Sequence, residues 1–488
     1  MARRAVRNGD NAAMQIEGVV TTGIYCRSDC AASPFPEHTR PFPTAAAAEA
    51  AGFRPCLRCR PWRLPAPQVG GAPAAVERAL MLITEGFLDE GGEPDLARHV
   101  GLSGRQLRRD FEEAIGASPD AVARSRRAHF ARRLLDETAM SVSDVAFAAG
   151  FGSIRQFNRV MRAVFRAAPG ELRAKRRRSD LLATDGGLRL RVAYRPPLAV
   201  REAIDYLGPR AIPGVEIASG GVYRRTMHSC GHPGVIEVFD HGDGAHLEIV
   251  AHLPIFAALI DEVARVRRLF RTDVDMRPAV AALSGDPLLG ALVTAAPGLR
   301  VLGAWDRFET GVRVVLGQQV SVAAATTLAG RLVQRYGAPL VGLSLPSGLT
   351  HLFPAAERLA EASDLADIGL PKARAASLRE FARRFADGVL HLEGTPDLEK
   401  LTGTLMEIPG IGPWSAQLLA ARMYDHPDAF PANDLGLRRA AARLLGRDDF
   451  IPATALVELA EQWRPFRSVA AAYLWRSGAS SAIGGSSP

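Results

Sequence analysis

Two glycines near the C-terminal end of the 488-residue chain have the spacing of a turn that can hold an anion. Gly410 and Gly412 lie in the run Ile-Pro-Gly-Ile-Gly-Pro, where the missing side chains let the backbone turn tightly and approach a ligand closely. Apolar residues recur with helical spacing over residues 414–423, so the amides of the turn would lie at a helix N-terminus, which favours phosphate. Such a run taken alone is more often an ordinary turn.

One carboxylate follows this turn at a distance that can bring it back to the same place. Asp434 comes 22 residues after Gly412, about one helix and one loop later. A carboxylate in a dry pocket stabilises the positive charge that develops on a sugar when its bond to a base breaks. The alternative is an aspartate that only caps a helix.

Together these motifs resemble the helix-hairpin-helix DNA glycosylases, in particular the 3-methyladenine DNA glycosylase II (AlkA-like) family. The resemblance covers residues 187 to about 480 and includes Val-Val-Leu-Gly-Gln-Gln-Val-Ser at 314–321 and Trp-Arg-Pro-Phe-Arg-Ser at 463–468. It implies a helical domain that flips an alkylated base out of duplex DNA and hydrolyses its N-glycosidic bond without a cofactor.

The resemblance also implies roles for single residues. Trp414 stands where strand-cleaving relatives carry a Schiff-base lysine, and none of the chain's three lysines matches that position, which implies hydrolysis without strand cleavage. Asp434 would be catalytic. Trp414, Trp475, Gln318 and Gln319 would form the base pocket, with the electron-rich rings favouring a cationic base, although either tryptophan alone is more often core. Gln319 would fill the gap left by the flipped nucleotide, where some relatives have an apolar residue, and the identity of that wedge stays open.

Four of the five cysteines lie in the first 59 residues. They are spaced as Cys26-x3-Cys30 and Cys56-x2-Cys59, with 25 residues between the two pairs. Two close pairs around a loop are typical of a tetrahedral zinc site, and so small a segment needs the ion to fold. We therefore expect one Zn²⁺ held by all four thiolates; the alternative is a metal-free module.

The residues around these cysteines resemble the N-terminal domain of the Ada family. The resemblance rests on Thr-Thr-Gly-Ile-Tyr-Cys-Arg at 21–27 and Gly-Phe-Arg-Pro-Cys-Leu-Arg-Cys-Arg at 52–60. It implies that Cys26 accepts a methyl group from a methyl phosphotriester. Four thiolates on Zn²⁺ carry a net charge of about −2, which methylation would reduce to about −1, weakening repulsion from the DNA backbone. The alternative is a purely structural zinc domain.

A repeat follows a linker rich in Pro, Gly and Ala at residues 63–75. An alanine, glycine and serine pattern at 97–103 recurs at 146–153, each time followed by helical apolar spacing. Each copy predicts a helix, a glycine turn, a serine N-cap and a second helix, as in a helix-turn-helix. Two such units joined by a long helix, about 119–137, resemble the AraC-family DNA-binding domain.

Basic and polar side chains lie on the exposed side of both second helices. They are Arg105, Arg108 and Arg109 in the first, and Arg155, Gln156 and Arg159 in the second. Such faces can enter two major grooves about one turn of DNA apart. Helical packing without a DNA role is the alternative.

Residues 188–283 show a different pattern. Alternating residues at 188–194 and apolar runs at 235–239 and 246–251 predict strands, and 255–270 predicts a helix, which makes a small α+β subdomain. The resemblance to the AlkA-like family implies that this subdomain has a structural role. Cys230, with His228 and His232 nearby, is expected to form no metal site, and it lacks the Pro-Cys-His setting of a methylguanine methyltransferase.

Length and charge agree with a chain of several domains that binds DNA. Residues 1–180 hold 28 Lys and Arg against 20 Asp and Glu, whereas the remainder holds 32 of each, so the net charge of +8 lies in the first third. A basic segment fits phosphate contacts, with a solvated Arg-rich surface as the alternative. No apolar run is long enough for a membrane span or signal peptide, so we expect a cytoplasmic protein. The family resemblances further imply a bacterial, nucleoid-associated protein.

We therefore predict a multidomain, mainly α protein. The expected parts are an Ada-like zinc domain (1–66), an all-α double helix-turn-helix domain (72–178), an α+β subdomain (187–283), an all-α helix-hairpin-helix glycosylase domain (284–480) and a flexible tail (481–488). The predicted function is repair of alkylated DNA coupled to damage sensing and promoter binding, by a monomer with RNA polymerase as a further partner. The alternative is a transcription activator whose inactive glycosylase domain only binds DNA.

Overall fold

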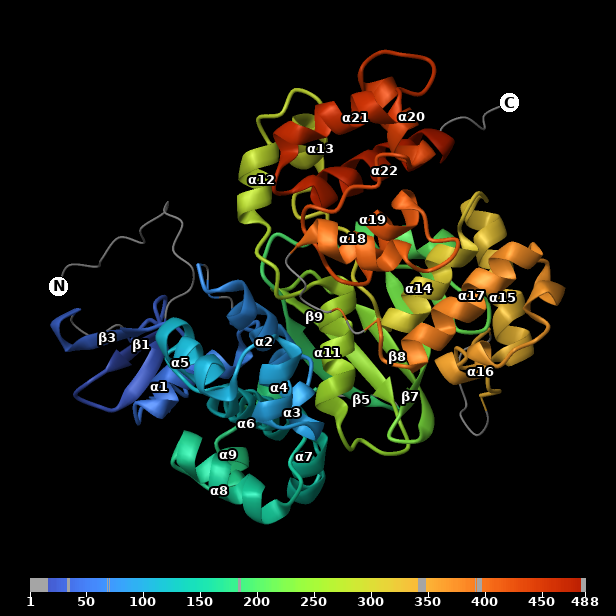
Figure 1. Cartoon of the computed structure of the whole chain (residues 1–488). Coiled ribbons are helices and arrows are strands. Elements are labelled where there is room, and N and C mark those ends of the chain that lie inside the picture. Colours follow the sequence, from blue (N-terminus) through green and yellow to red (C-terminus); the bar gives the residue numbers. More distant parts are fainter. Residues whose placement is uncertain are drawn as a thin grey trace. The chain divides into compact units, whose positions relative to one another are not determined.

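The computed structural model describes residues 16–32, 36–67, 69, 71–182, 186–340, 348–390, 392 and 397–483. The chain forms two compact units, Met1–Leu181 and Leu182–Pro488 (Figure 1). The first 15 residues of the predicted zinc domain and most of the predicted tail lie outside the described residues.

A small four-stranded sheet begins the first unit. Its strands are β1 (Ile16–Val19), β2 (Ile24–Arg27), β3 (Thr39–Phe42) and β4 (Arg54–Pro55), in the order β3-β1-β2-β4. Strands β2 and β4 pair in parallel with Tyr25 opposite Pro55, so that the next residues, Cys26 and Cys56, leave the pair side by side. Helix α1 (Ala45–Ala50), capped by the Thr44 side chain, packs on this sheet. We call residues 16–66 the zinc module.

Helices form the rest of the first unit. They are α2 (Ala74–Thr84), α3 (Phe87–Glu90), α4 (Glu93–His99), α5 (Gly104–Ile115), α6 (Pro119–Glu137), α7 (Val142–Ala148), α8 (Ile154–Phe165) and α9 (Pro169–Ala174). The long helix has the bounds that the sequence predicts, because a capping Ser118 followed by Pro119 marks its start. It is buried along most of its length and contacts helices from both helix-turn-helix motifs.

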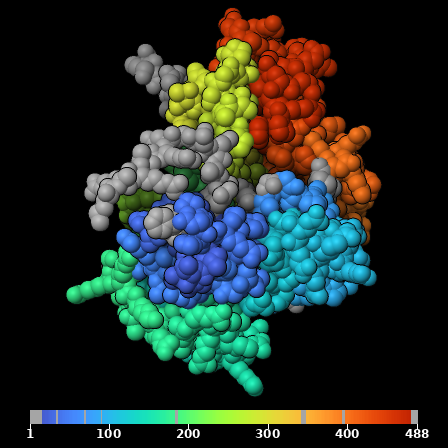
Figure 2. All heavy atoms as spheres, turned by 90° about the vertical axis from the view of Figure 1, so that its left-hand side faces the viewer, coloured from blue at the N-terminus to red at the C-terminus, as the bar shows by residue number. Residues whose placement is uncertain are grey.

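Buried polar contacts hold the zinc module against α6. The Tyr25 hydroxyl donates to Glu49 Oε1 at 2.7 Å, and His129 Nε2 of α6 lies 2.7 Å from the same oxygen. The Trp62 indole N–H donates to Asp136 Oδ2 at 3.3 Å. These contacts tie the zinc module to α6 within the first unit, which is coloured from blue to green in Figure 2.

An antiparallel sheet with the order β5-β9-β8-β7-β6 begins the second unit. Its strands are β5 (Leu188–Ala193), β6 (Glu216–Ser219), β7 (Val222–Ser229), β8 (His232–Phe239) and β9 (His246–His252), accompanied by α10 (Val200–Leu207) and α11 (Leu259–Phe270). The three predicted strands are confirmed. The sequence did not predict β7 because its arginines interrupt the apolar pattern, although Arg225 is buried there in ion pairs.

Two helical lobes complete this unit, each with its own apolar core. The first lobe contains α14 (Arg307–Leu316), α15 (Val322–Tyr336), α16 (Ala356–Ala360), α17 (Lys372–Ala386), α18 (Leu398–Met406) and α19 (Pro413–Arg422). The second lobe contains α12 (Arg277–Leu283), α13 (Gly290–Ala295), α20 (Leu435–Leu444), α21 (Ala453–Ala460) and α22 (Arg467–Ile483). Trp475 packs against both cores, so it marks the seam of the two lobes.

Among the described residues, no helix combines the length and the apolar character that a membrane crossing requires.

Candidate active site and metal site

Asp434 lies at the seam of the two lobes, held by three N–H donors. Its Oδ2 accepts from the Trp414 indole at 3.0 Å, and its Oδ1 accepts from the Trp475 indole at 3.1 Å. Oδ1 also accepts from the backbone N–H of Leu437 at 3.0 Å. The two tryptophans come from α19 of the first lobe and α22 of the second, so the carboxylate joins both lobes.

Helix capping and a place in the site are both properties of Asp434. The Leu437 contact makes it the N-cap of α20, which is the role that the sequence offered as the alternative. Its other oxygen, Oδ2, accepts from the Trp414 indole N–H. The residue is half-buried and lines a cavity. A cap at this place fixes the carboxylate's orientation, since the side chain is bound to the backbone that follows it.

The predicted glycine hairpin connects α18 to α19. Gly410 has φ +86°, a left-handed conformation, and a side chain on it would lie 2.0 Å from Ser377 Oγ, so no other residue fits. Gly412 is exposed at the N-cap of α19, with Pro413 as the first helical residue. The amide of Gln318 donates to the Gly410 carbonyl at 2.8 Å and to Ser415 Oγ at 2.9 Å. Gln318 therefore braces the hairpin.

A cavity of about 230 Å³ opens beside Asp434. It is lined by parts of the sheet subdomain and of both lobes, including Trp414, Trp475, Leu418, Val320, Val322 and Thr326. Gln318 and Gln319, which the sequence assigned to the base pocket, are not among its lining residues. Gln319 is instead exposed in the turn from α14 to α15, with φ +56°.

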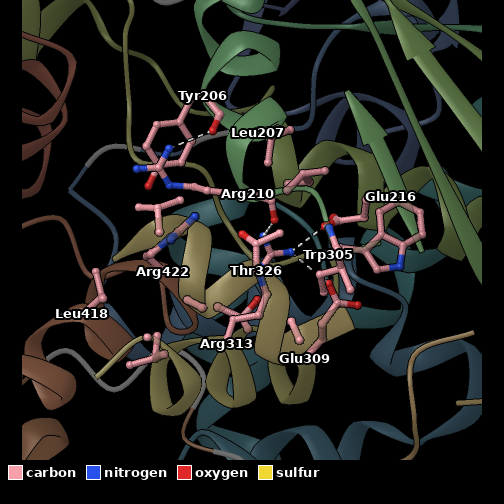
Figure 3. A pocket seen from close by; sticks show the side chains of 18 of the residues that line it. Tyr206, Leu207, Arg210, Glu216, Trp305, Glu309, Arg313, Thr326, Leu418 and Arg422 are labelled. Carbon is pink, nitrogen blue, oxygen red and sulfur yellow. Dashed lines mark hydrogen bonds and ion pairs between the residues drawn. The ribbon is translucent and has the colours of Figure 1, made fainter. Parts of the chain in front are cut away.

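Arginines and a tyrosine form one end of this cavity (Figure 3). The guanidinium carbon of Arg210 lies 3.8 Å from the ring centre of Tyr206, and that of Arg422 lies 5.5 Å from it. Burial raises the pKa of a phenol, but the Arg422 and Arg210 guanidiniums outweigh that effect and lower the pKa of Tyr206. Burial also lowers the pKa of Arg422.

A buried ionic network underlies that end of the cavity. Arg225 donates to Glu309 Oε2 at 2.6 Å and to Glu216 Oε1 at 3.3 Å, and Arg313 donates to Glu216 Oε2 at 2.8 Å. Burial would raise the pKa of Glu216, but Arg313 and Arg225 lower it to about 2. At Glu309 burial prevails over Arg225, and the pKa is raised. The network ties β6 and β7 of the sheet to α14 of the first lobe.

Residues 188–283, for which the sequence predicted a structural role, also contribute to the wall of the cavity. Tyr206, Arg210, Glu216 and Arg225 come from that subdomain and line the cavity. The sequence carried no signal for them, because isolated arginines in a weak strand pattern read as surface residues. Gly436 was missed as well: a side chain there would lie 3.0 Å from Asp434 Oδ1, so the glycine leaves room for the carboxylate.

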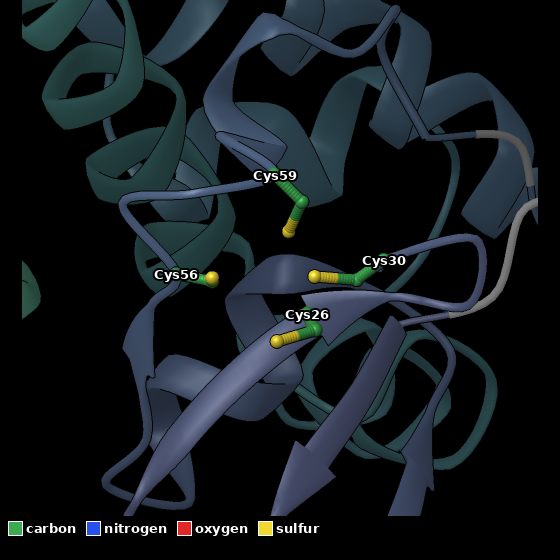
Figure 4. Close-up of side chains that lie close together, drawn as sticks. All are labelled: Cys26, Cys30, Cys56 and Cys59. Carbon is green, nitrogen blue, oxygen red and sulfur yellow. The ribbon is translucent and has the colours of Figure 1, made fainter. Parts of the chain in front are cut away.

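The four N-terminal cysteines meet at one point (Figure 4). Their sulfurs all lie within 4.8 Å of one another, where a tetrahedral Zn²⁺ with Zn–S bonds of about 2.3 Å needs sulfurs about 3.8 Å apart. Backbone N–H groups of Arg27 and Arg58 donate to Cys59 Sγ and Cys56 Sγ, both at 3.4 Å, as expected for thiolates. Cys26, Cys30 and Cys56 are buried and Cys59 is half-buried. These residues fit a zinc ion.

The predicted DNA-contacting side chains lie on α5 and α8. Arg105, Arg155 and Arg159 are exposed, and Gln156 is half-buried. Arg108 is exposed but pairs with Glu93 across the motif.

Cys230 is exposed in a tight turn, where its thiol donates to the Ala257 carbonyl at 3.0 Å. Among the described residues the four N-terminal cysteines form the only cluster with metal-ligand geometry.

Four protein-family models match successive parts of the chain. They are the metal binding domain of Ada at residues 2–61, a helix-turn-helix domain at 96–175, the AlkA N-terminal domain at 189–306, and the HhH-GPD superfamily base excision DNA repair protein at 312–465. These matches confirm the predicted family resemblances and the mainly helical, multidomain fold class.

Known proteins match over most of the chain. A probable bifunctional transcriptional activator/DNA repair enzyme AlkA of Mycobacterium tuberculosis (strain CDC 1551 / Oshkosh) is 41% identical over 466 residues, 94% of this chain and 92% of the relative. DNA-3-methyladenine glycosylase 2 of Escherichia coli (strain K12) is 32% identical over 58% of this chain and 95% of its own. In fold, the solved 3-methyladenine DNA glycosylase of Archaeoglobus fulgidus covers 60% of this chain and 98% of its own, with a TM-score of 0.51 and 21% identity. With a relative this similar over nearly its whole length, the chain belongs to the family of bifunctional transcriptional activator/DNA repair enzymes AlkA.

Proposed function

We propose that the second unit is a monofunctional DNA glycosylase that hydrolyses the N-glycosidic bond of alkylated bases of the 3-methyladenine type. The observation that carries this is the Asp434 carboxylate, fixed by two indole N–H groups and one backbone N–H at the edge of a cavity. The names of the relatives support the same reaction class.

The site is suited to stabilising positive charge on the sugar. An N-alkylated purine is already a good leaving group, so charge stabilisation matters more than proton donation. Asp434 stabilises the developing oxocarbenium ion and orients the attacking water, and a fixed contact of this kind contributes about 3 kcal/mol or more. No lysine lines the cavity within the described part of the chain, which favours hydrolysis over Schiff-base chemistry.

The hairpin and the turn before α15 would hold the DNA. Exposed amides at Gly412 begin a ten-residue helix and suit a backbone phosphate. Gln319, exposed and held in a left-handed conformation, is our candidate to fill the gap that the flipped nucleotide leaves.

Asp434→Asn tests the catalytic assignment. Asparagine caps a helix as well as aspartate does, so the fold should persist. Its amide nitrogen cannot accept an indole N–H, and the negative charge is lost, so we expect release of methylated purine from alkylated duplex to fall by about 100-fold or more.

Asp397→Asn is the matched control, because Asp397 caps α18 and does not line the cavity. It should retain wild-type release. Unchanged release by purified Asp434→Asn protein would disprove the assignment, and a wild-type protein without release would favour an activator whose glycosylase domain only binds DNA.

For the first unit we propose an Ada-like damage sensor that binds promoter DNA. The Cys26 thiolate would attack the methyl carbon of a methyl phosphotriester, so that an S–C bond forms, the C–O bond breaks and the phosphodiester leaves as an anion. Bound zinc, held by all four cysteines, would keep the thiols deprotonated at neutral pH. We further propose that the protein acts as a monomer and contacts RNA polymerase at its promoter.

Peptide mapping by mass spectrometry tests the sensor. After incubation of the full chain with methylated duplex, we expect one CH₂ increment on the peptide that contains Cys26. The more exposed Cys59 serves as the internal control. An increment on the peptide that contains Cys59 would mean that Cys59, and not Cys26, accepts the methyl group. No increment on either peptide would leave only a structural role for the zinc site.

A further inference from the structure

The two helix-turn-helix motifs share a turn glycine and a serine N-cap, although the turn before α8 is one residue longer and the N-cap φ is −74° at Ser103 and −159° at Ser153. The turn glycines Gly101 and Gly150 both have φ +77°. The N-cap hydroxyls of Ser103 and Ser153 each accept from the backbone N–H three residues later, both at 3.2 Å. Both recognition helices, α5 and α8, therefore begin with the same serine cap.

The two helices also bury corresponding positions. Each helix has 12 residues, and the first corresponding buried side chains are Leu107 in α5 and Phe157 in α8. The next pairs are Phe111 with Met161 and Ile115 with Phe165, always fifty positions apart. A helix that buries the same positions exposes the same positions, so side chains fifty residues apart point from matching places.

Three positions outside these buried ones carry the same residues in both helices, with Gln106 exposed and Gln156 half-buried. Arg-Gln-x-x-Arg stands at 105–109 in α5 and at 155–159 in α8. Within the described residues, no hydrogen bond or ion pair occupies the side chains of Arg105, Arg155 or Arg159, whereas Arg109 touches only the adjacent Asp110. These side chains are therefore available to a partner.

Each of the three residues has a preferred base. In the major groove, arginine binds guanine through O6 and N7, and glutamine binds adenine through N6 and N7. We propose that α5 and α8 read the same bases, so that the DNA target of this protein contains one short element twice. This inference rests on the proposed promoter binding by the first unit and adds the form of its target.

The two helices differ at their other positions, among them the first helical residue and the place held by Arg108 in α5 and Asn158 in α8. Ile154, the first residue of α8, is 42% exposed, whereas Gly104 stands at the matching place in α5. An exposed aliphatic side chain beside a base-reading glutamine suits the methyl group of thymine. The second element should therefore carry an added thymine preference that the first lacks.

Selection from a randomised duplex pool tests the proposal with the full chain. The protein is used before and after incubation with methylated duplex, because the sensor is expected to control affinity, and bound DNA is sequenced. We expect an enriched site with the same element twice, in either orientation. Two unrelated elements would overturn the inference while leaving promoter binding intact, and no enrichment in either arm would overturn both.

A matched pair of variants assigns the elements. Gln106→Ala should relax the base preference in one element only, and Gln156→Ala in the other, each by about 5- to 150-fold in affinity for the preferred base. Ile154→Ala should remove the thymine preference from the element that Gln156→Ala affects. Two outcomes would contradict a shared readout even though both proteins still bind. In the first, one variant loses its base preference in both elements; in the second, the two variants lose preference for different bases.

Discussion

At the scale of single residues, the site depends on how tightly the Asp434 carboxylate is held. Three N–H donors from three segments contact its two oxygens, and together they fix the orientation of the carboxylate. Electrostatic catalysis needs such fixed groups, because a carboxylate that reorients during the reaction loses part of its effect.

Gly436→Ala tests this requirement without replacing Asp434 itself. The new Cβ would lie 3.0 Å from Asp434 Oδ1 and 3.7 Å from Trp475 Cδ1, so the acidic group must shift by a few tenths of an ångström. We expect kcat for base release to fall on the order of tenfold. The matched control is Gly403→Ala in α18, where a Cβ meets nothing within 4 Å and activity should be unchanged. Equal activities of the two variants would mean that the position of Asp434 is not critical.

At the scale of elements, the buried network joins a sheet to a helical lobe directly under the cavity. Arg225 and Glu309 are each less than 5% exposed, so removing Arg225 leaves the buried Glu309 with only the longer contact to Arg313, at 3.4 Å. The exposed pair of Arg383 with Glu380 on α17 has no such consequence, because water replaces the lost partner.

Arg225→Met should accordingly lower stability by about 3–5 kcal/mol. Arg383→Met should change it by less than about 1 kcal/mol. Urea unfolding of the full-length variants, followed by tryptophan fluorescence, gives the comparison, since Trp305 lies 4.7 Å from the Arg225 guanidinium. Similar urea midpoints for the two variants would show that the network does not hold the sheet to the lobe.

The elements also show which features a sequence can reveal. The cysteine pairs, the serine caps and the helix at 119–137 depend on residues close together in the chain, and they were predictable. The cavity's Tyr206 and Arg422 lie more than two hundred residues apart in sequence, and only packing brings them together. A helix cap and a catalytic carboxylate have the same sequence signal, so the sequence leaves both roles of Asp434 open, and the structure shows the cap.

At the scale of the whole molecule, each unit has its own cores, so each should keep its activity when the other is disturbed. The apolar cluster of the zinc module has five buried residues among those described. Small modules of this kind unfold when their metal ion is removed. The two lobes of the second unit have larger cores and no residue of the cysteine cluster.

Zinc removal therefore separates the two proposed functions. Treatment of the full chain with a chelator should abolish methyl transfer to Cys26, and zinc added back should restore it. The kcat/KM for release of 3-methyladenine from unmethylated-phosphate duplex should stay within about twofold, because none of the four clustered cysteines lines the cavity beside Asp434. A parallel loss of base release with zinc content would instead mean that the first unit supplies part of the excision activity, and that sensing and repair are one coupled process.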